Sequence, residues 1–328
     1  MVGVAIGGQT DSMTTRVAIL DDYQGVALAL ADWKSLGPDV AVQAFRERLY
    51  GEDVLAERLR GFEVIVAMRE RTHFPRSLLA RLPNLKLLVT TGMRNVAIDS
   101  KAAGELGIVV SGTGMLTPPT AELTWGLIIG LARHIPQEAQ QMRGGGWQAT
   151  IGVGLNGKVL GILGLGKLGS EVARVGRAFQ MEVIAWSENL TAEHASSLGA
   201  TRVEKDELFR RADFVTIHLI LSKRTRGLVT AHELALMKPS AYLINTSRGP
   251  IVEERALIEA LTQRKLAGAA LDVYDEEPLP ADHPLRKLEN VVLTPHLGYV
   301  TEENYRQCYG DAVEDIRAFL AGRPIRTI

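Results

Sequence analysis

Short apolar runs alternate with longer amphipathic runs along most of the chain. This is the pattern of parallel strands joined by helices. The first series of apolar runs lies at residues 16–20, 40–45, 64–68, 85–89 and 108–110. A second series lies at residues 159–163, 182–186, 214–219, 241–245, 268–273 and 291–294. The pattern predicts an α/β fold with two doubly wound parallel sheets, each covered by helices on both faces.

Two further helices are predicted outside this alternation. A long apolar helix at residues 118–135 is followed by the glycine run "RGGGW", and we expect this segment to bridge two domains. Residues 301–324 follow helical spacing up to Gly322 and Pro324, which should end the helix. The chain therefore appears in sequence as two sheet domains and a C-terminal helix.

Composition excludes several classes of function. Of the 328 residues, 46% are hydrophobic and the formal net charge is −1, so nothing favours binding to nucleic acid or to an acidic membrane surface. No apolar run reaches the roughly 18 residues that span a bilayer. Cys308 is the single cysteine, which rules out an intrachain disulfide and favours a cytoplasmic protein. Residues 1–14 lack a signal-peptide pattern and are expected to be a disordered extension.

A glycine-rich loop follows the first strand of the second series. Its pattern is Gly164-x-Gly166-x-x-Gly169, with Lys167 and Leu168 between the last two glycines. Such a loop gives a tight turn, close approach of backbone to a pyrophosphate, and a helix N-terminus for the phosphates. A glycine triplet alone is often only a turn, and methyltransferases that use S-adenosylmethionine also have one. Here strand, loop, helix and next strand follow in order, which favours dinucleotide binding.

The next strand should end in an acidic residue if the cofactor is NAD, but Ser187 stands there and Glu188 follows. No arginine or lysine is near to hold the additional phosphate of NADP. We therefore expect NAD and leave NADP open.

Three later strands end in residues that suit one chemistry. Arg248 follows the first, Asp272 and Glu277 the second, and His296 the third. An arginine binds a carboxylate through two parallel hydrogen bonds, and a histidine exchanges a proton with a hydroxyl that becomes a carbonyl. A nearby carboxylate fixes the tautomer of the histidine and favours its charged form. Beside a hydride carrier, this set would interconvert 2-hydroxy and 2-oxo acids.

Each of these residues also has an ordinary interpretation. Arg248 alone could be a charge at a helix start, Glu277 a solvated loop acid, and His296 a turn histidine. Because they stand at successive strand ends after a dinucleotide loop, the carboxyl ends of the strands should bring them to one edge of the sheet. The combination favours the functional interpretation.

Four stretches of the chain resemble the D-isomer-specific 2-hydroxyacid dehydrogenases. They are "GILGLGKLG", "LINTSRGPIVEERALIEAL", "LAGAALDVYDEEPLPADHPL" and "VVLTPHLG", and the similarity runs from about Arg16 to Ile325. The resemblance implies that Arg248 binds the substrate carboxylate, that His296 is the general acid/base and that Glu277 is its partner. Glutamate at 277 is unlike formate dehydrogenases, which have glutamine there. The cofactor-binding residues expected on the same basis are Gly164, Gly166, Lys167, Leu168, Gly169, Ser187, His218, Thr246, Asp272 and Gly298.

The resemblance also implies a domain plan. Residues 15–117 with 300–328 would form a substrate domain, residues 118–299 a dinucleotide-binding domain, and a cleft would lie between them. Members of the family are usually homodimers through the cofactor domain. We expect the same here, with a small 2-oxo or 2-hydroxy acid as substrate and no metal.

The substrate loop departs from the family pattern. In "TTGMRNVAID", Arg94 stands where a second glycine is usual. We therefore hypothesise that Met93, Arg94 and Asn95 shape specificity and that Arg94 favours a second anionic group. Tyr299 could reach the substrate or only pack. "HLILS" replaces the usual "HLPLT" after His218, which weakens inference about the adenine pocket.

The leading function is a nicotinamide-dependent oxidoreductase that reduces a 2-oxo acid, with protonated His296 as the donor. The rival is a regulatory protein of the same fold that senses NAD(H) without significant turnover. The sequence shows no additional interaction tail or basic patch for that role.

Overall fold

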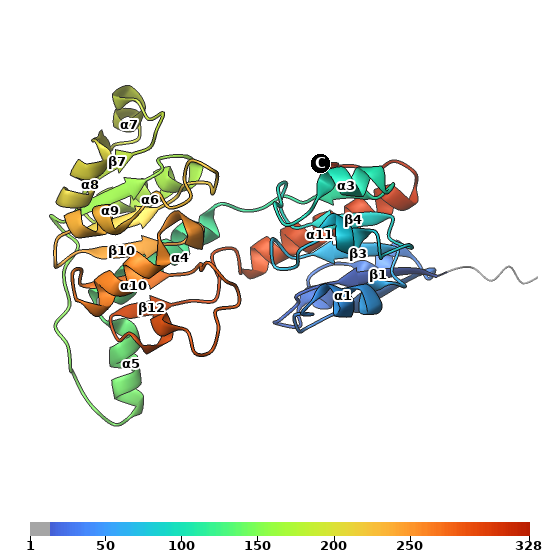
Figure 1. The fold of residues 1–328 in the computed structure, drawn as a ribbon, viewed down its shortest axis with the longest axis horizontal. Coiled ribbons are helices and arrows are strands. Elements are labelled where there is room, and N and C mark those ends of the chain that lie inside the picture. The colour runs from blue at the N-terminus through green and yellow to red at the C-terminus, as the bar shows by residue number, and fades with distance from the viewer. Residues whose placement is uncertain (1–13) are drawn as a thin grey trace, which may run out of the picture. The chain divides into compact units, whose positions relative to one another are not determined.

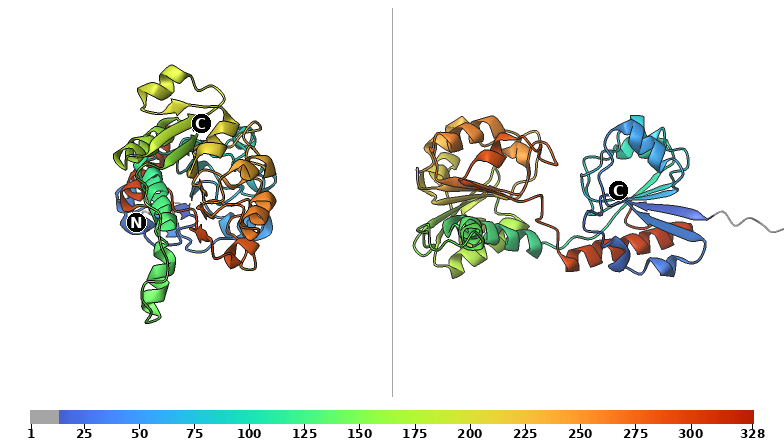
Figure 2. Two further views of the ribbon diagram at one scale, coloured as in Figure 1. Left: turned by 90° about the vertical axis from the view of Figure 1, so that its left-hand side faces the viewer. Right: turned by 90° about the horizontal axis from the view of Figure 1, so that it is seen from below.

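The computed structural model describes residues 14–328, which form two compact units (Figure 1). One unit ends at Leu116 and resumes at Thr301–Ile328, and the other is Thr117–Val300. The predicted extension, residues 1–14, lies outside the described residues except for its last position. In Figure 2, the right-hand view shows helices on both faces of each sheet. The predicted fold class, α/β with two doubly wound parallel sheets, is confirmed.

The first unit holds a five-stranded sheet in the order β2-β1-β3-β4-β5, and all of its strand pairs are parallel. Its central strands are apolar and buried, because helices cover both faces of the sheet. The strands are β1 (Thr15–Ile19), β2 (Val40–Ala44), β3 (Val64–Ala67), β4 (Leu87–Thr90) and β5 (Val109–Gly112). The helices are α1 (Glu52–Leu59), α2 (Arg76–Leu79), α3 (Ser100–Glu105) and α11 (Glu302–Leu320), with 3-10 turns at Ala27–Ala29 and Trp33–Leu36.

The second unit holds a seven-stranded parallel sheet in the order β12-β11-β10-β9-β6-β7-β8. Two separate apolar cores lie on its faces: one includes side chains of α8, α9 and α10, the other side chains of α4 and α6. The strands are β6 (Val159–Leu163), β7 (Glu182–Trp186), β8 (Thr201–Arg202), β9 (Phe214–Ile217), β10 (Tyr242–Asn245), β11 (Gly268–Leu271) and β12 (Val291–Leu293). The helices are α4 (Pro118–Ala132), α5 (Ile135–Arg143), α6 (Lys167–Ala178), α7 (Ala192–Ser197), α8 (Lys205–Arg211), α9 (Ala231–Leu236) and α10 (Glu254–Thr262), with 3-10 turns at Gly249–Ile251 and Pro284–Lys287.

The long helix predicted at residues 118–135 begins at Pro118 as expected but is three residues shorter, and a second helix that was not predicted follows it. α4 ends at Ala132, His134 takes a left-handed conformation with φ of 50°, and α5 then runs on to Arg143. Pro136 explains the break, because in a continuous helix it would remove the bond to Ala132 and clash with that carbonyl. The sequence analysis also missed two small features. One is the two-residue strand β8, and the other is the pairing of the C-terminal tail with β5 through Ser111 and Thr327.

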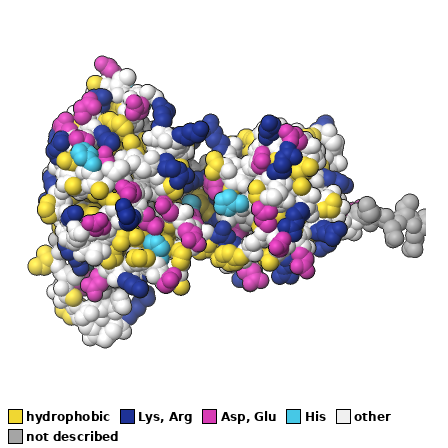
Figure 3. All heavy atoms as spheres, viewed as in Figure 1, with side chains coloured by type: hydrophobic (Ala, Val, Ile, Leu, Met, Phe, Trp, Pro, Cys, Tyr) yellow, Lys and Arg dark blue, Asp and Glu magenta, His cyan; other side chains and the backbone are white. Residues whose placement is uncertain are grey.

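The surface and the helices fit the composition. On the face shown in Figure 3, acidic and basic side chains are interspersed, as expected for a chain of net charge −1. None of the helices within residues 14–328 has both the length and the apolar character needed to cross a membrane.

Candidate active site

The glycine loop connects β6 to α6, and its backbone geometry depends on two of its three glycines. Gly164 has φ of 99°, and a Cβ there would lie 2.7 Å from the carbonyl oxygen of His218. A Cβ at Gly169 would lie 2.1 Å from the carbonyl oxygen of Gly164, so the start of α6 packs directly on the loop. At Gly166, in contrast, the space that a Cβ would occupy is open among the described residues. Two glycines therefore close the turn and the third leaves the backbone accessible to a ligand.

The N-terminus of α6 lies directly after the glycine loop and adds free N–H groups and a partial positive charge. Gly166 is the N-cap and Ser170 N–H donates to its carbonyl, so the N–H groups before Ser170 point out of the helix end. The helix dipole favours an anion at that end. Lys167 and Leu168 are the first two helical residues, with Lys167 exposed. These features fit the pyrophosphate of a dinucleotide.

The ends of β7 and β9, the two strands that flank β6, complete this side of the sheet edge. Ser187 follows β7 and is half-buried, and exposed Glu188 comes next. His218 follows β9, and its Nε2 lies 2.9 Å from Thr216 Oγ1. Burial lowers the pKa of His218 to about 3, which keeps the imidazole neutral. Within residues 14–328, its buried Nδ1 has no hydrogen-bond partner.

Arg248 follows β10 in a turn that the neighbouring side chains define. Asn245 Nδ2 donates to the Arg248 carbonyl at 3.0 Å, and the Arg248 guanidinium donates to the Ser247 carbonyl at 2.8 Å. Gly249 comes next, and a Cβ there would lie 2.1 Å from the carbonyl carbon of Tyr274. No larger residue fits, so Gly249 seats the arginine turn on the loop that follows β11. Arg248 also acts electrostatically on Glu277 of that loop, in the direction that lowers the pKa, but less strongly than His296 does.

Asp272 follows β11 and is fully buried. Its Oδ1 accepts from Thr294 Oγ1 at 2.6 Å and Leu297 N–H at 2.7 Å, and its Oδ2 accepts from Gly298 N–H at 2.9 Å. Burial raises its pKa, although these hydrogen bonds act in the opposite direction. All three bonds go to the loop after β12, so Asp272 fixes the segment that carries His296. The sequence indicated a residue near the cofactor but not this positioning contact.

His296 and Glu277 form a close pair of ionisable side chains at this edge. His296 Nδ1 lies 2.6 Å from Glu277 Oε2, and Glu277 Oε1 accepts from Tyr274 N–H at 3.0 Å. Burial alone would raise the pKa of Glu277, but the hydrogen bond and charge of His296, the Tyr274 N–H and the charge of Arg248 together lower it. Because the carboxylate accepts from Nδ1, Nε2 is the nitrogen left to exchange a proton with a ligand.

The backbone and the neighbours of His296 are unusual. The backbone of His296 has φ of 55°, a value that residues other than glycine rarely adopt. The Tyr299 ring meets its imidazole edge to face at 5.5 Å between centroids, and Tyr299 is itself buried. Strained residues of this kind are concentrated at functional sites.

Several threonines hold the site together and were missed from the sequence. Thr120 of α4 donates to the Gly298 carbonyl at 2.7 Å, and Thr124 lies 2.9 Å from Thr246, oxygen to oxygen. Thr246, expected at the cofactor, thus also ties β10 to α4. Two threonines four positions apart on a helix are a weak indication of contacts to other elements. Serine and threonine side chains on helices often form hydrogen bonds only within their own helix.

The predicted substrate loop follows β4 in the other unit. Met93 and Arg94 are exposed, whereas Asn95 is buried and donates to the Arg69 carbonyl at 2.6 Å and to Thr90 Oγ1 at 2.8 Å. Gly92 has φ of 92°, and its N–H donates to Thr113 Oγ1 at 3.0 Å. Asn95 therefore shapes the loop from inside.

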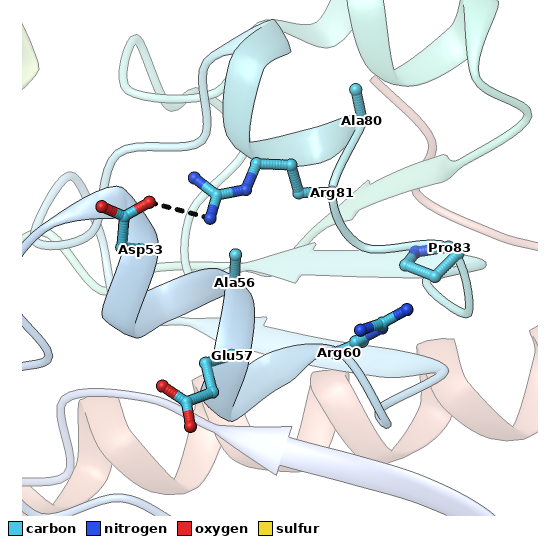
Figure 4. Close-up of a pocket in the computed structure, with 7 residues that line it drawn as sticks. All are labelled: Asp53, Ala56, Glu57, Arg60, Ala80, Arg81 and Pro83. Carbon is cyan, nitrogen blue, oxygen red and sulfur yellow. Dashed lines mark ion pairs between the residues drawn. The ribbon is translucent and has the colours of Figure 1, made fainter.

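A pocket of about 620 Å³ lies elsewhere, between α1 and the segment after α2 (Figure 4). Its lining alternates in charge, and Arg81 pairs with Asp53 at 2.8 Å. None of the predicted site residues lines it. Its residues are Asp53, Ala56, Glu57, Arg60, Ala80, Arg81 and Pro83.

Comparisons with known proteins give the family to which the chain belongs. Residues 125–298 match the family described as D-isomer specific 2-hydroxyacid dehydrogenase, NAD binding domain. A glyoxylate reductase of Aeropyrum pernix is 41% identical over 256 residues, which are 75% of this chain and 76% of the relative. A D-3-phosphoglycerate dehydrogenase of Methanocaldococcus jannaschii is 38% identical over 275 residues, 83% of this chain but only 52% of that longer protein.

A solved structure of a phosphoglycerate oxidoreductase from Vibrio cholerae has a TM-score of 0.90 and 38% identity, covering 94% of this chain and 99% of that one. The family match spans more than half of the chain, and the glyoxylate reductase matches along most of its own length. The chain therefore belongs to the D-isomer specific 2-hydroxyacid dehydrogenase family, whose cofactor is a nicotinamide dinucleotide.

Proposed function

We propose that this protein reduces a 2-oxo acid to the D-2-hydroxy acid with an Arg248, Glu277 and His296 set. The observation that carries the proposal is the 2.6 Å contact between His296 Nδ1 and Glu277 Oε2, beside Arg248 and in the same unit as the glycine loop. Family membership gives the reaction class; the roles of the individual residues are our inference.

Arg248 binds the substrate carboxylate. Its guanidinium offers a planar fork that matches a carboxylate through two hydrogen bonds, and a lysine would not reproduce that geometry. The turn is held by Asn245 and seated by Gly249, so the arginine is positioned before substrate arrives. Arg248 thereby sets which carbon of the acid lies beside the cofactor.

His296 supplies the proton. When bound, the nicotinamide supplies the hydride for the carbonyl carbon. As negative charge develops on the carbonyl oxygen, His296 Nε2 gives up its proton to that oxygen, while Glu277 stabilises the imidazolium beforehand. In reduction the histidine must start protonated, and in oxidation it must start neutral, so the two directions have opposite pH requirements.

The cofactor is proposed to be NAD rather than NADP. Ser187 is half-buried after β7 and Glu188 is exposed beside it. A carboxylate near the adenosine ribose repels a 2′-phosphate and can accept from a free hydroxyl. Comparing KM for NADH with KM for NADPH tests this directly.

Substrate choice is proposed to lie with Met93, Arg94 and Tyr299, with Asn95 as support for the loop. Relatives of this chain are named for glyoxylate and for D-3-phosphoglycerate, which differ in size and charge. An exposed arginine in the loop favours substrates with a second anionic group. The hypothesis fails if Arg94→Gly lowers turnover of mono- and dicarboxylic 2-oxo acids equally.

A panel of 2-oxo acids with NADH and NADPH, followed by absorbance, tests the reaction. We expect turnover with at least one acid, and loss of that turnover in His296→Ala while NADH still binds. Tight cofactor binding without turnover on any acid would instead support the rival, a regulatory protein that senses NAD(H).

A homodimer through the cofactor-binding unit completes the proposal. Every residue of α5 is at least partly exposed, and the segment after it exposes Trp147 by 70% and Ile151 by 93%. Exposed apolar side chains so close together favour a protein interface. Sedimentation of the wild-type protein should show a dimer. The Trp147→Glu variant should shift towards the monomer. A monomeric wild-type protein would contradict this proposal.

A further inference from the structure

The fold brings one arginine to the turn that follows β7. β8 pairs with β7 in parallel, and Arg202 is the second of its two residues. Residues 187–190 form the turn, which Leu190 N–H closes on the Ser187 carbonyl at 3.0 Å. Arg202 Nε donates to the Leu190 carbonyl at 3.1 Å. The sequence around Ser187 contains no cation, yet Arg202 contacts this turn from the neighbouring strand.

The turn lies where a bound dinucleotide would place its adenosine ribose. Gly164 N–H donates to the Trp186 carbonyl at 2.9 Å, so the glycine loop is tied to the end of β7. In a doubly wound sheet with the pyrophosphate at the glycine loop, the ribose hydroxyls reach the end of the next strand. The groups around residues 187–190 are therefore those that can distinguish a free 2′-hydroxyl from a 2′-phosphate.

Glu204 engages the guanidinium of Arg202 from the solvent side. Arg202 Nη1 lies 2.7 Å from Glu204 Oε1, and the Glu204 side chain is 71% exposed whereas that of Arg202 is half-buried. With Nε at Leu190 and Nη1 at Glu204, only Nη2 has no hydrogen-bond partner within residues 14–328. An exposed ion pair of this kind contributes little to stability, so its main consequence is local charge.

The charges around the turn disfavour an additional phosphate. Glu188 is exposed on the turn itself, and Glu204 stands beside Arg202, so two carboxylates face one guanidinium. A 2′-phosphate carries about two negative charges near neutral pH and would be repelled by both acids. A ribose with free hydroxyls meets no such repulsion, because a hydroxyl can donate to a carboxylate.

We propose that the Arg202–Glu204 pair sets the cofactor preference of this protein. Arg202 holds the ribose turn through the Leu190 carbonyl, and Glu204 withholds the guanidinium from a 2′-phosphate. The inference rests on the proposed function and deepens its assignment of NAD. Removing the charge of Glu204 makes the arginine available to a phosphate monoester, the group that its planar fork binds best.

Direct binding of the two dinucleotides tests the pair. NADH and NADPH are titrated separately and their dissociation constants are followed by cofactor fluorescence. Wild type should bind NADH more tightly by about tenfold or more. Glu204→Gln should tighten NADPH about fivefold or more and change NADH less than about twofold. Since the gain is electrostatic and exposed, it should shrink as salt is added.

Two further variants separate this effect from a general change in charge. Glu207→Gln removes an acid of α8 that pairs with Arg211 at 2.6 Å, and should leave both dissociation constants unchanged. Arg202→Lys combined with Glu204→Gln keeps a positive charge but loses the planar fork, and should keep only part of the gain for NADPH. Equal changes for both dinucleotides in Glu204→Gln, or the same gain in Glu207→Gln, would overturn the proposal.

Binding distinguishes failure of this inference from failure of the proposed function, because it requires no turnover. If wild type binds NADH but reduces no 2-oxo acid, the proposed reduction fails and the titrations still judge the pair. If wild type reduces an acid and Glu204→Gln leaves the affinity for NADPH unchanged, the reduction stands and the pair is excluded. Tighter binding of NADPH than of NADH by wild type would also overturn the inference.

Discussion

The carboxyl edges of the two sheets are built differently. At the seven-stranded sheet, polar side chains bond to one another across neighbouring strands: Asp272 holds the β12 loop through three contacts, and Glu277 holds His296. At the five-stranded sheet, buried polar side chains also bond to one another, as Thr72 does to Asp21. The arginines there lie instead on an aromatic ring, on glycines and on backbone carbonyls, as Arg71 does on Tyr23.

The difference separates chemistry from recognition. A proton donor must be held within a few tenths of an ångström, and buried reciprocal hydrogen bonds provide that precision. Recognition of a remote anion needs charge at an edge that tolerates substrates of different length. The proposed reaction lies at the first edge, and the proposed choice of substrate, through Met93 and Arg94, lies at the second.

The largest expected effect is at the edge assigned to chemistry. His296→Ala removes the proton donor and should lower kcat about 10²–10⁴-fold for every 2-oxo acid that is turned over. Binding of NADH, followed by fluorescence, should persist. His283→Ala is the matched control, because His283 also pairs with a glutamate, Glu254, at 3.1 Å. Near-normal turnover in His296→Ala would defeat the assignment.

Glu277→Gln should act through His296. The lowered pKa of Glu277 means that it remains a carboxylate at mildly acidic pH, where it favours the imidazolium. Removing that charge should lower kcat/KM for reduction about tenfold or more. As the pH is raised, the variant should also lose its activity at a lower pH than wild type does. Glu276→Gln changes the exposed neighbour and serves as control. An unchanged pH profile in Glu277→Gln would contradict the coupling.

Gly249→Ala tests how tightly the same edge is packed. Its Cβ would lie 2.1 Å from the Tyr274 backbone, so we expect a loss of about 1–3 kcal/mol in the free energy of unfolding. Gly104 of α3, in the other unit, has open space around it, and Gly104→Ala should stabilise by about 0.5–1 kcal/mol. Urea unfolding measures both. A stable, fully active Gly249→Ala would show that the arginine turn is not seated as described.

The smallest effect concerns His218 and the pH dependence of stability. Its pKa falls from an ordinary value of 6.5 to about 3 on folding. The neutral imidazole therefore stabilises the fold above pH 6.5, and this contribution is lost progressively as pH falls towards 3. His218→Gln, which does not titrate, should give a flatter profile of unfolding free energy over that window. Parallel profiles for variant and wild type would refute this.

Much of the fold was readable because local patterns determine it. Parallel strands buried on both faces are short apolar runs, and the strands predicted in both series are present in the structure. The break between α4 and α5 was missed, although Pro136 was the available signal. β8 has only two residues, too few for a periodic pattern.

The candidate site could be predicted from the sequence only in part. Arg248, Glu277 and His296 stand out because strand ends in a parallel sheet share one edge. The support given by Thr120, Thr124 and Thr294 depends on hydrogen bonds between residues far apart in the chain, such as Thr120 with Gly298. The sequence does not reveal such pairs.

One comparison tests the division of labour most directly. For wild type, His296→Asn and Arg94→Gly, kcat/KM is measured with 2-oxoglutarate and 2-oxopentanoate, and with hydroxypyruvate and its 3-phosphate. The account predicts that His296→Asn lowers all values in proportion and leaves the ratio within each pair unchanged, whereas Arg94→Gly shifts the ratio against the anionic member. A changed ratio in His296→Asn together with an unchanged ratio in Arg94→Gly would contradict it.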